Sequence, residues 1–334
     1  MQALLWFLLP VAAVSGWWVA QLGYRKKASS RSRLNSAYGQ GLNHLLNEEP
    51  DKATQVLIQM VEVDPDTVEL HLALGSLFRR RGETDRAIRV HQNIIARSKL
   101  SETLLAQAKL ELGRDYLSAG LLDRAESLLQ ALLDAGVSEK EVCQHLIEVY
   151  QQEKEWGKAV MVGKRLVKMD AQAWKPRVAQ YHCELGDAAL KSGQHDQALQ
   201  AAETAHREDP DCARATLLMG KIYQDRGDYR AAIKCYQSLE TLNGGLLSEV
   251  MDDIKTCYTC LDDSSGWEDF RKVSMERGGY LLFAQKKLED RQTTEQQPRY
   301  RCEECGFASR KLFWQCPGCQ CWSSVKPIKI GNAI

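Results

Sequence analysis

The chain begins with a long apolar stretch, because no ionisable side chain occurs from Ala3 to Leu22. At about 1.5 Å of rise per residue, a helix of this length spans the roughly 30 Å hydrocarbon core of a bilayer. Tryptophan and tyrosine side chains, which favour the membrane interface, lie toward its ends at Trp6, Trp17, Trp18 and Tyr24. The pattern predicts a transmembrane anchor over residues 1–24.

Basic residues follow the anchor at once, and residues 25–34 form a basic juxtamembrane linker with Arg25, Lys26, Lys27, Arg31 and Arg33. Cations gather on the cytoplasmic side of membrane helices, so the N-terminus is expected outside and the rest of the chain in the cytoplasm. The alternative is a cleaved signal peptide. It needs its positive charge before the apolar run, and here the charge lies after it.

The middle of the chain alternates apolar and polar positions with a helical period, and small residues recur along it. Alanines that open the second helix of each unit stand at Ala53, Ala87, Ala125, Ala159, Ala198 and Ala232. The gaps between them are 34, 38, 34, 39 and 34 residues. A period of 34 is typical of tetratricopeptide repeats. We therefore expect an all-α superhelix over residues 35–290, with six clear units and a degenerate seventh from about Leu247 to Phe283.

Other positions keep the same phase. A glycine stands twelve residues before most of these alanines, where two helices must approach closely, as at Gly75 and Gly220. Arg81-Gly82-Glu83 and Arg226-Gly227-Asp228 supply turns within units. The two longer gaps place insertions near residues 98–101 and 170–176. In such an array the first helix of each unit lines a concave groove that holds partner proteins. By spacing, the groove-facing side chains are Arg79, Arg114, Gln144, Asp187 and Lys221.

The C-terminal segment carries the strongest chemical signal. After a polar linker at residues 291–298, two Cys-x-x-Cys pairs follow, Cys302 with Cys305 and Cys316 with Cys319. Four thiolates at this spacing suit one tetrahedral Zn or Fe ion, which would supply folding energy to residues 299–334. Gly306 and Gly318 are expected to adopt positive φ, and Phe307, Phe313, Trp314 and Trp322 to form an apolar shell. Cys321 lies outside the pair spacing.

The charge balance and the absence of catalytic motifs argue against two classes of function. Lysine plus arginine and aspartate plus glutamate both number 44, so the net charge is zero, which argues against a nucleic-acid-binding protein. The basic excess of residues 299–334 is mild. There is no phosphate-binding glycine loop, no His-Glu-x-x-His and no nucleophile elbow. An enzymatic function therefore has no support, and a scaffold or adaptor explains the chain best.

The combination resembles the lipopolysaccharide assembly protein B family. The resemblance covers most of the chain, from Leu9–Ala13 in the anchor, through Asp85–Arg89 and Asp123–Glu126 in the repeats, to Tyr300–Phe307 and Lys326–Ile328 in the tail. It implies a single-pass protein of the bacterial inner membrane, with a periplasmic N-terminus and a rubredoxin-like module that packs against the repeats. It assigns iron to Cys302, Cys305, Cys316 and Cys319, with zinc as the alternative.

The resemblance also implies partners. Family members promote degradation of LpxC, the deacetylase committing to lipid A, by the membrane protease FtsH, and gather lipopolysaccharide assembly enzymes at the membrane. Whether copies of the chain form a homo-oligomer is left open. The stretch from Tyr280 to Pro298 is short for the family, as if one or two terminal repeats were missing. The alternative function is a membrane-tethered electron-transfer protein, since iron held by four thiolates can change oxidation state.

Overall fold

The computed structural model describes residues 50–63, 67–97, 100–276 and 298–328. The predicted anchor, the basic linker, the first part of the repeat array and the 291–297 linker lie outside these residues. So do Asp64 and Pro65, and so does the segment where terminal repeats are expected to be missing. None of the described helices combines the length and the apolar character that a membrane span requires.

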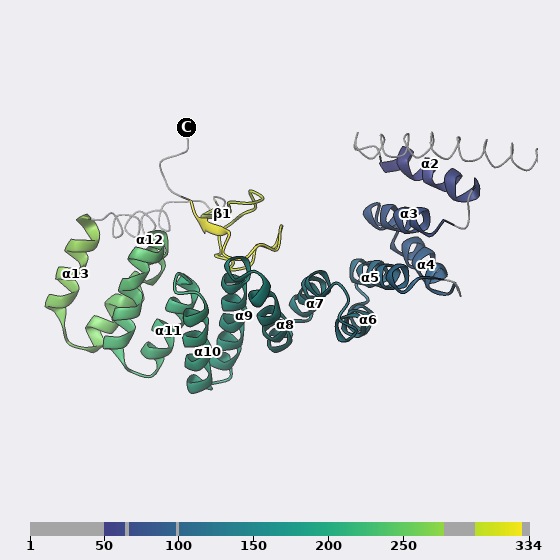
Figure 1. The fold of residues 1–334 in the computed structure, drawn as a ribbon. Helices are drawn as coiled ribbons and strands as arrows, with labels where there is room; N and C mark the ends of the chain where they lie inside the picture. The colour runs from purple at the N-terminus through teal and green to yellow at the C-terminus, as the bar shows by residue number, and fades with distance from the viewer. Residues whose placement is uncertain (1–49, 64–66, 98–99, 277–297, 329–334) are drawn as a thin grey trace, which may run out of the picture. The chain divides into compact units, whose positions relative to one another are not determined.

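The described chain divides into two compact units between Val149 and Tyr150. The first contains α2 (Pro50–Val63), α3 (Val68–Arg80), α4 (Thr84–Ile95), α5 (Glu102–Ser118) and α6 (Leu122–Asp134), and it ends within α7 (Glu139–Glu153). The second continues with α8 (Trp156–Met169), α9 (Ala171–Lys191), α10 (His195–Glu208), α11 (Ala213–Asp225), α12 (Tyr229–Cys260) and α13 (Ser264–Glu276). Within each unit, helices that follow one another in the chain pack in pairs, as Figure 1 shows.

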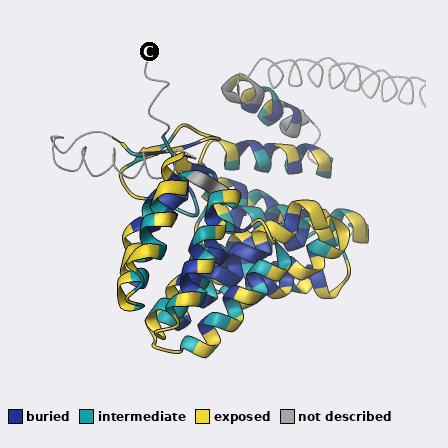
Figure 2. Cartoon of the chain, turned by 90° about the vertical axis from the view of Figure 1, so that its left-hand side faces the viewer, coloured by how far each residue is buried: buried dark blue, intermediate teal, exposed yellow. Residues whose placement is uncertain are grey.

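The predicted helical repeats are confirmed, and the recurring alanines explain the pairing. In α4, α6, α8, α10 and α12 the aligned alanine is the fourth residue of its helix and is fully buried. A larger side chain there would force the paired helices apart. The buried positions face one another between the helices, while the outer faces are exposed, as the colours of Figure 2 show.

The turns and the close approaches also follow the prediction. Gly82 takes a φ of +78°, which a residue with a side chain adopts only under strain. It lets Glu83 N–H donate to Phe78 O at 2.8 Å and so closes the end of α3. At Gly220, an added Cβ would lie 2.5 Å from Cε1 of Tyr236 on α12. The glycine is therefore required by contact between the two helices.

Two regions differ from the simple repeat. The insertion expected at residues 170–176 forms the first turns of α9, which is 21 residues long and contains Pro176. At the other end, α12 continues for 32 residues across the boundary between the sixth and seventh units. Its second half and α13, which carries Trp267, lie where the degenerate seventh repeat is expected.

Three short strands complete the second unit: β1 (Tyr300–Cys302), β2 (Ala308–Ser309) and β3 (Val325–Pro327). They form an antiparallel sheet in the order β2-β1-β3, with Tyr300 paired to both Ser309 and Pro327. Tyr300, Cys302, Cys316 and Val325 form a small core of their own, lined by Phe307 and Phe313. We call residues 298–328 the metal module.

Candidate metal centre

The two Cys-x-x-Cys pairs form matching turns that bring four sulfurs together. In the first turn, Cys302 N–H donates to Phe307 O (2.8 Å) and Gly306 N–H donates to Cys302 O (3.0 Å). In the second, Cys316 N–H donates to Cys321 O and Gln320 N–H to Cys316 O, both at 2.9 Å. Equivalent backbone bonds thus point the four thiols inward.

The prediction for the glycines was half right. The residue after each pair has positive φ: Gly306 at +75° and Gln320 at +60°. Gly318 does not, because it precedes Cys319 rather than following it. A Cβ at Gly318 would lie 3.3 Å from the sulfur of Cys305 and 3.6 Å from Phe307 Cβ. The lack of a side chain there lets the two turns approach each other.

The positions of the four sulfurs fit tetrahedral coordination of one metal ion. All four Sγ atoms lie within 4.8 Å of one another. Cys302 to Cys319 and Cys305 to Cys316 are both 3.6 Å, so each close contact joins the two turns. A tetrahedron with metal–sulfur bonds of about 2.3 Å has edges of about 3.8 Å. A disulfide would need about 2.05 Å. Cys321 is exposed and lies outside this four-sulfur cluster.

The pKa values of the thiols also favour a bound cation at this site. The pKa of Cys302 is lowered to about 6, chiefly by the hydrogen bond with the Ser324 hydroxyl, 3.3 Å away. The pKa of Cys319 is raised. The amide N–H of Cys321 lowers it, but burial and the thiols of Cys302 and Cys305 outweigh that effect. Several thiolates this close repel one another unless a positive ion lies between them. A bound ion would hold the two turns together and supply folding energy.

The metal module is docked on the repeat helices of the second unit. The Oε1 atom of Gln151, near the end of α7, accepts two bonds from the module: Trp322 Nε1 at 2.9 Å and Gln315 Nε2 at 3.0 Å. Gln180 Nε2 on α9 donates to Ser323 Oγ at 3.1 Å. Farther along, β3 contacts α12, and the hydroxyl of Tyr300 hydrogen-bonds Glu249.

The centre of this docking surface is aromatic. The Trp322 ring meets Trp156 and Tyr181 edge-on at 5.9 and 5.8 Å, and those two rings stack at 6.1 Å. The expectation that Trp314 and Trp322 belong to the shell of the metal module was wrong. Phe307 and Phe313 pack inside it at 6.1 Å, whereas the two tryptophans contact the repeats.

Arg214 on α11 completes the docking surface. Its guanidinium lies 5.7 Å from the Trp314 ring and 5.9 Å from the Trp322 ring. It donates to Glu184 Oε1 (2.8 Å) and Asp187 Oδ2 (2.6 Å) on α9. Burial lowers its pKa, but these two carboxylates outweigh burial and raise it, so the group stays charged. Sequence reasoning missed Arg214, Gln151, Trp156 and Tyr181, because each contacts a module that begins more than eighty residues later in the chain.

The predicted groove residues have different environments. Arg79 on α3 is engaged with α5, donating to Glu111 and Asp115 at 2.6 Å each. Arg114 on α5 donates to Glu111 (2.6 Å), His145 (2.8 Å) and Glu141. Asp187 pairs with Arg214, Gln144 is half-buried and Lys221 is exposed. Arg79, Arg114 and Asp187 thus link neighbouring repeats to one another.

Comparison with known proteins agrees with this architecture. Residues 300–327 match the rubredoxin metal binding domain, and residues 70–103 and 189–242 match the tetratricopeptide repeat. Lipopolysaccharide assembly protein B of Escherichia coli (strain K12) is 32% identical, with 98% of this chain and 99% of that protein aligned. The chain belongs to the lipopolysaccharide assembly protein B family. The family protein of Haemophilus influenzae (strain Rd) is 28% identical, with 98% of each chain aligned.

The alignment with the Escherichia coli family protein extends over 384 positions, against 334 residues in this chain, so at least 50 positions have no counterpart here. Among solved structures, the tetratricopeptide-repeat protein YrrB is 17% identical, covering 57% of this chain and 94% of that one, with a TM-score of 0.39. That likeness adds nothing to the family assignment.

Proposed function

We propose that this protein is a non-enzymatic adaptor of the bacterial inner membrane that regulates lipopolysaccharide assembly. The observation that carries the proposal is family membership along the whole length of proteins named for lipopolysaccharide assembly. The architecture supports it: helical repeats commonly bind other proteins, and the side chains brought together in the described residues bind metal and hold the module in place.

The finer proposal concerns the partners. The adaptor brings FtsH and LpxC together, so that the protease degrades the deacetylase, and it gathers lipopolysaccharide assembly enzymes. Anchoring by residues 1–24 is part of this proposal, because confinement to the membrane would raise the effective concentration of membrane partners without new contacts. Lys221 is exposed and available to a partner. Arg79 and Arg114 offer only their exposed parts, 16% and 27% of each side chain.

The metal module has a structural role in this proposal. Cys302, Cys305, Cys316 and Cys319 hold one iron or zinc ion, which fixes the two turns. The fixed turns place Trp322, Gln315 and Ser323 against α7, α8 and α9. The metal thereby sets which surface of the second unit the partners meet.

The half-life of LpxC in cells depleted of the native protein tests the proposal. Full-length protein should restore rapid loss of LpxC after synthesis is blocked. A chain lacking residues 1–24, produced at the native level and folded by circular dichroism, should leave LpxC stable because it is no longer held at the membrane. Rapid loss of LpxC with the anchorless chain would refute the membrane-tethered adaptor. An unchanged half-life with the full-length protein would refute the link to LpxC.

A further inference from the structure

The second unit carries a concentration of positive charge on one helix. Helix α8 contains Lys158, Lys164, Arg165 and Lys168 and no acidic residue. The surrounding segment, residues 154–177, has seven basic residues against two acidic ones, in a chain whose net charge is zero. Neither the metal module nor the docking surface uses this charge.

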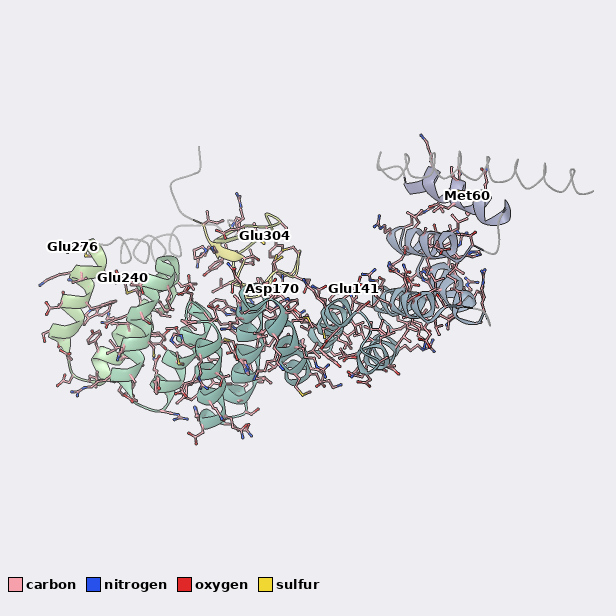
Figure 3. All side chains as sticks on the ribbon, viewed as in Figure 1. Met60, Glu141, Asp170, Glu240, Glu276 and Glu304 are labelled. Atoms are coloured by element: carbon pink, nitrogen blue, oxygen red, sulfur yellow. The ribbon has the colours of Figure 1, made fainter. Side chains whose placement is uncertain are left out.

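Three of these four cations lie on the exposed face of α8, whereas Lys158 is half-buried with its Nζ 5.3 Å from the Tyr150 ring. One side of the helix is buried through Ala159, Val162 and Leu166 and packs against α9. The opposite stripe is exposed, with residues at intervals of three and four: Met161, Lys164, Arg165, Lys168 and Met169. Asp170, labelled in Figure 3, follows this stripe and caps α9 by accepting a bond from Ala173 N–H.

Two large apolar side chains stand among the cations. Met161 is 66% exposed and Met169 is 45% exposed, and they are two turns apart on the same stripe. Methionine is flexible and polarisable, so it can enter irregular apolar surroundings at little conformational cost. Lys154 precedes α8, and Lys175 and Arg177 lie in the first turns of α9; all three are also exposed. We call the exposed stripe of α8 the α8 face.

We propose that the α8 face binds the anionic headgroup surface of a phospholipid membrane, with Met161 and Met169 entering the headgroup layer. Each lysine or arginine near an anionic bilayer contributes to attraction, and the contributions add across a patch. Exposed apolar side chains beside cations are what interfacial helices use to enter the bilayer boundary.

A protein partner fits this surface less well. Lysine is depleted from protein interfaces, and four of the six exposed cations named here are lysines. A bound helix would also need a row of apolar contacts at three- and four-residue spacing. The stripe offers only two, separated by cations. Headgroups impose no such pattern, because they supply many equivalent negative charges.

The inference rests on the proposed membrane location and adds a second contact to it. An N-terminal anchor fixes the chain to the bilayer at one end only. A basic face on the second unit would hold that unit and its docked module close to the membrane surface. The anchor and the face make distinct predictions, since salt weakens headgroup attraction but leaves an inserted apolar helix in place.

Photocrosslinking in reconstituted vesicles tests the proposal. Full-length protein carries benzoylphenylalanine in place of Met161. The vesicles contain phosphatidylcholine alone or with about one-third phosphatidylglycerol. We expect roughly tenfold more lipid adduct in the anionic vesicles, and most of it should disappear when salt rises from about 0.1 M to about 0.5 M. The matched control carries the same group in place of Val273 on α13, which is 42% exposed but lies among acids and bases in similar number. It should give little lipid adduct in either vesicle.

Charge variants identify the cause. Lys164→Gln with Lys168→Gln should remove most of the adduct at position 161, while Lys164→Arg with Lys168→Arg should retain it. Equal adduct at positions 161 and 273, or equal adduct in neutral and anionic vesicles, would overturn the proposal. So would a crosslink to a protein chain in place of lipid. Protein that fails to float with vesicles at about 1 M salt would instead refute the anchor, independently of the α8 face.

Discussion

Replacing Trp322 with alanine should release the metal module from the repeats while leaving its metal bound. The Trp322 ring lies against Trp156 and Tyr181, and its Nε1 donates to Gln151. The Arg214 guanidinium lies 5.9 Å from the same ring, so these contacts are all with the repeat helices. None of the four cysteines depends on the ring for its position. Their turns are closed by backbone hydrogen bonds within the module.

The magnitude follows from the contacts removed. Two edge-on aromatic contacts contribute about 0.5–1.5 kcal/mol each, and the hydrogen bond contributes a similar amount. The sum for these three contacts is roughly 1.5–4.5 kcal/mol, which shifts the docking equilibrium by roughly 10- to 2,000-fold. Trp322→Phe keeps most of the ring contact and loses the donor, so its shift should be about tenfold or less.

Hydrogen exchange and metal analysis together provide the assay. Amides that exchange through undocking should exchange faster in Trp322→Ala by up to the calculated factor, in peptides covering the module and the facing part of α9. The metal content per chain should equal that of the unchanged protein. Loss of metal from Trp322→Ala would mean that the ring is part of the module's own core. Unchanged exchange would mean that the contacts of the Trp322 ring do not hold the module.

Three further predictions concern the repeats and are read from urea unfolding. Asp115→Ala removes a fully buried carboxylate that bonds Arg79 and His91, and should lower the free energy of unfolding by about 3–5 kcal/mol. The exposed control Glu148→Ala should lower it by about 0.5 kcal/mol or less, and equal losses would contradict the buried network. Gly220→Ala should destabilise the protein by about 1–3 kcal/mol, because the added methyl group meets Tyr236. Gly157→Ala, where an added Cβ has nothing within 4 Å, should stabilise it by up to about 1 kcal/mol. Stabilisation by both variants would contradict the close approach of α11 and α12 at Gly220. Burial raises the pKa of Glu111, but Arg79 and Arg114 outweigh burial and lower it below its ordinary 4.5. The contribution of Glu111 is therefore complete above that value and lost as pH falls through the lower folded pKa, and Glu111→Gln should show a smaller loss of stability below pH 4.5; parallel pH profiles would contradict this.

The repeats could be predicted because their sequence signal is local. An alanine at the fourth position of each second helix, such as Ala87 or Ala232, is required wherever two helices pair this closely. The four cysteines could be found for the same reason, since two short turns determine their spacing. Gly318 shows the limit of local reasoning. Its role depends on contact with the other turn, near Cys305, and not on its own backbone angles.

The docking surface could not be predicted because its parts are distant in sequence. Trp322 has the same local pattern as an aromatic residue that shields a metal site, and only the fold places it on Trp156 and Tyr181. The basic side chains on the first helices pose the same difficulty. Spacing placed Arg79 and Arg114 on one face, but it did not show that carboxylates of the next repeat engage them, Glu111 and Asp115 for Arg79 and Glu141 for Arg114. Superhelical stacking decides which unit supplies each partner.

In the proposed function, a metal-fixed module docked on the repeats lets a tethered adaptor hold its partners. The most direct measurement is in-cell crosslinking followed by recovery of FtsH and LpxC with three forms of the anchored chain: unchanged, Cys316→Ser with Cys319→Ser, and Cys321→Ser. The third is the matched control, since Cys321 lies outside the four-sulfur cluster. We predict recovery of both partners with the unchanged chain and Cys321→Ser, and loss of at least one with the double variant. Equal recovery with a double variant shown to lack metal would contradict the claim.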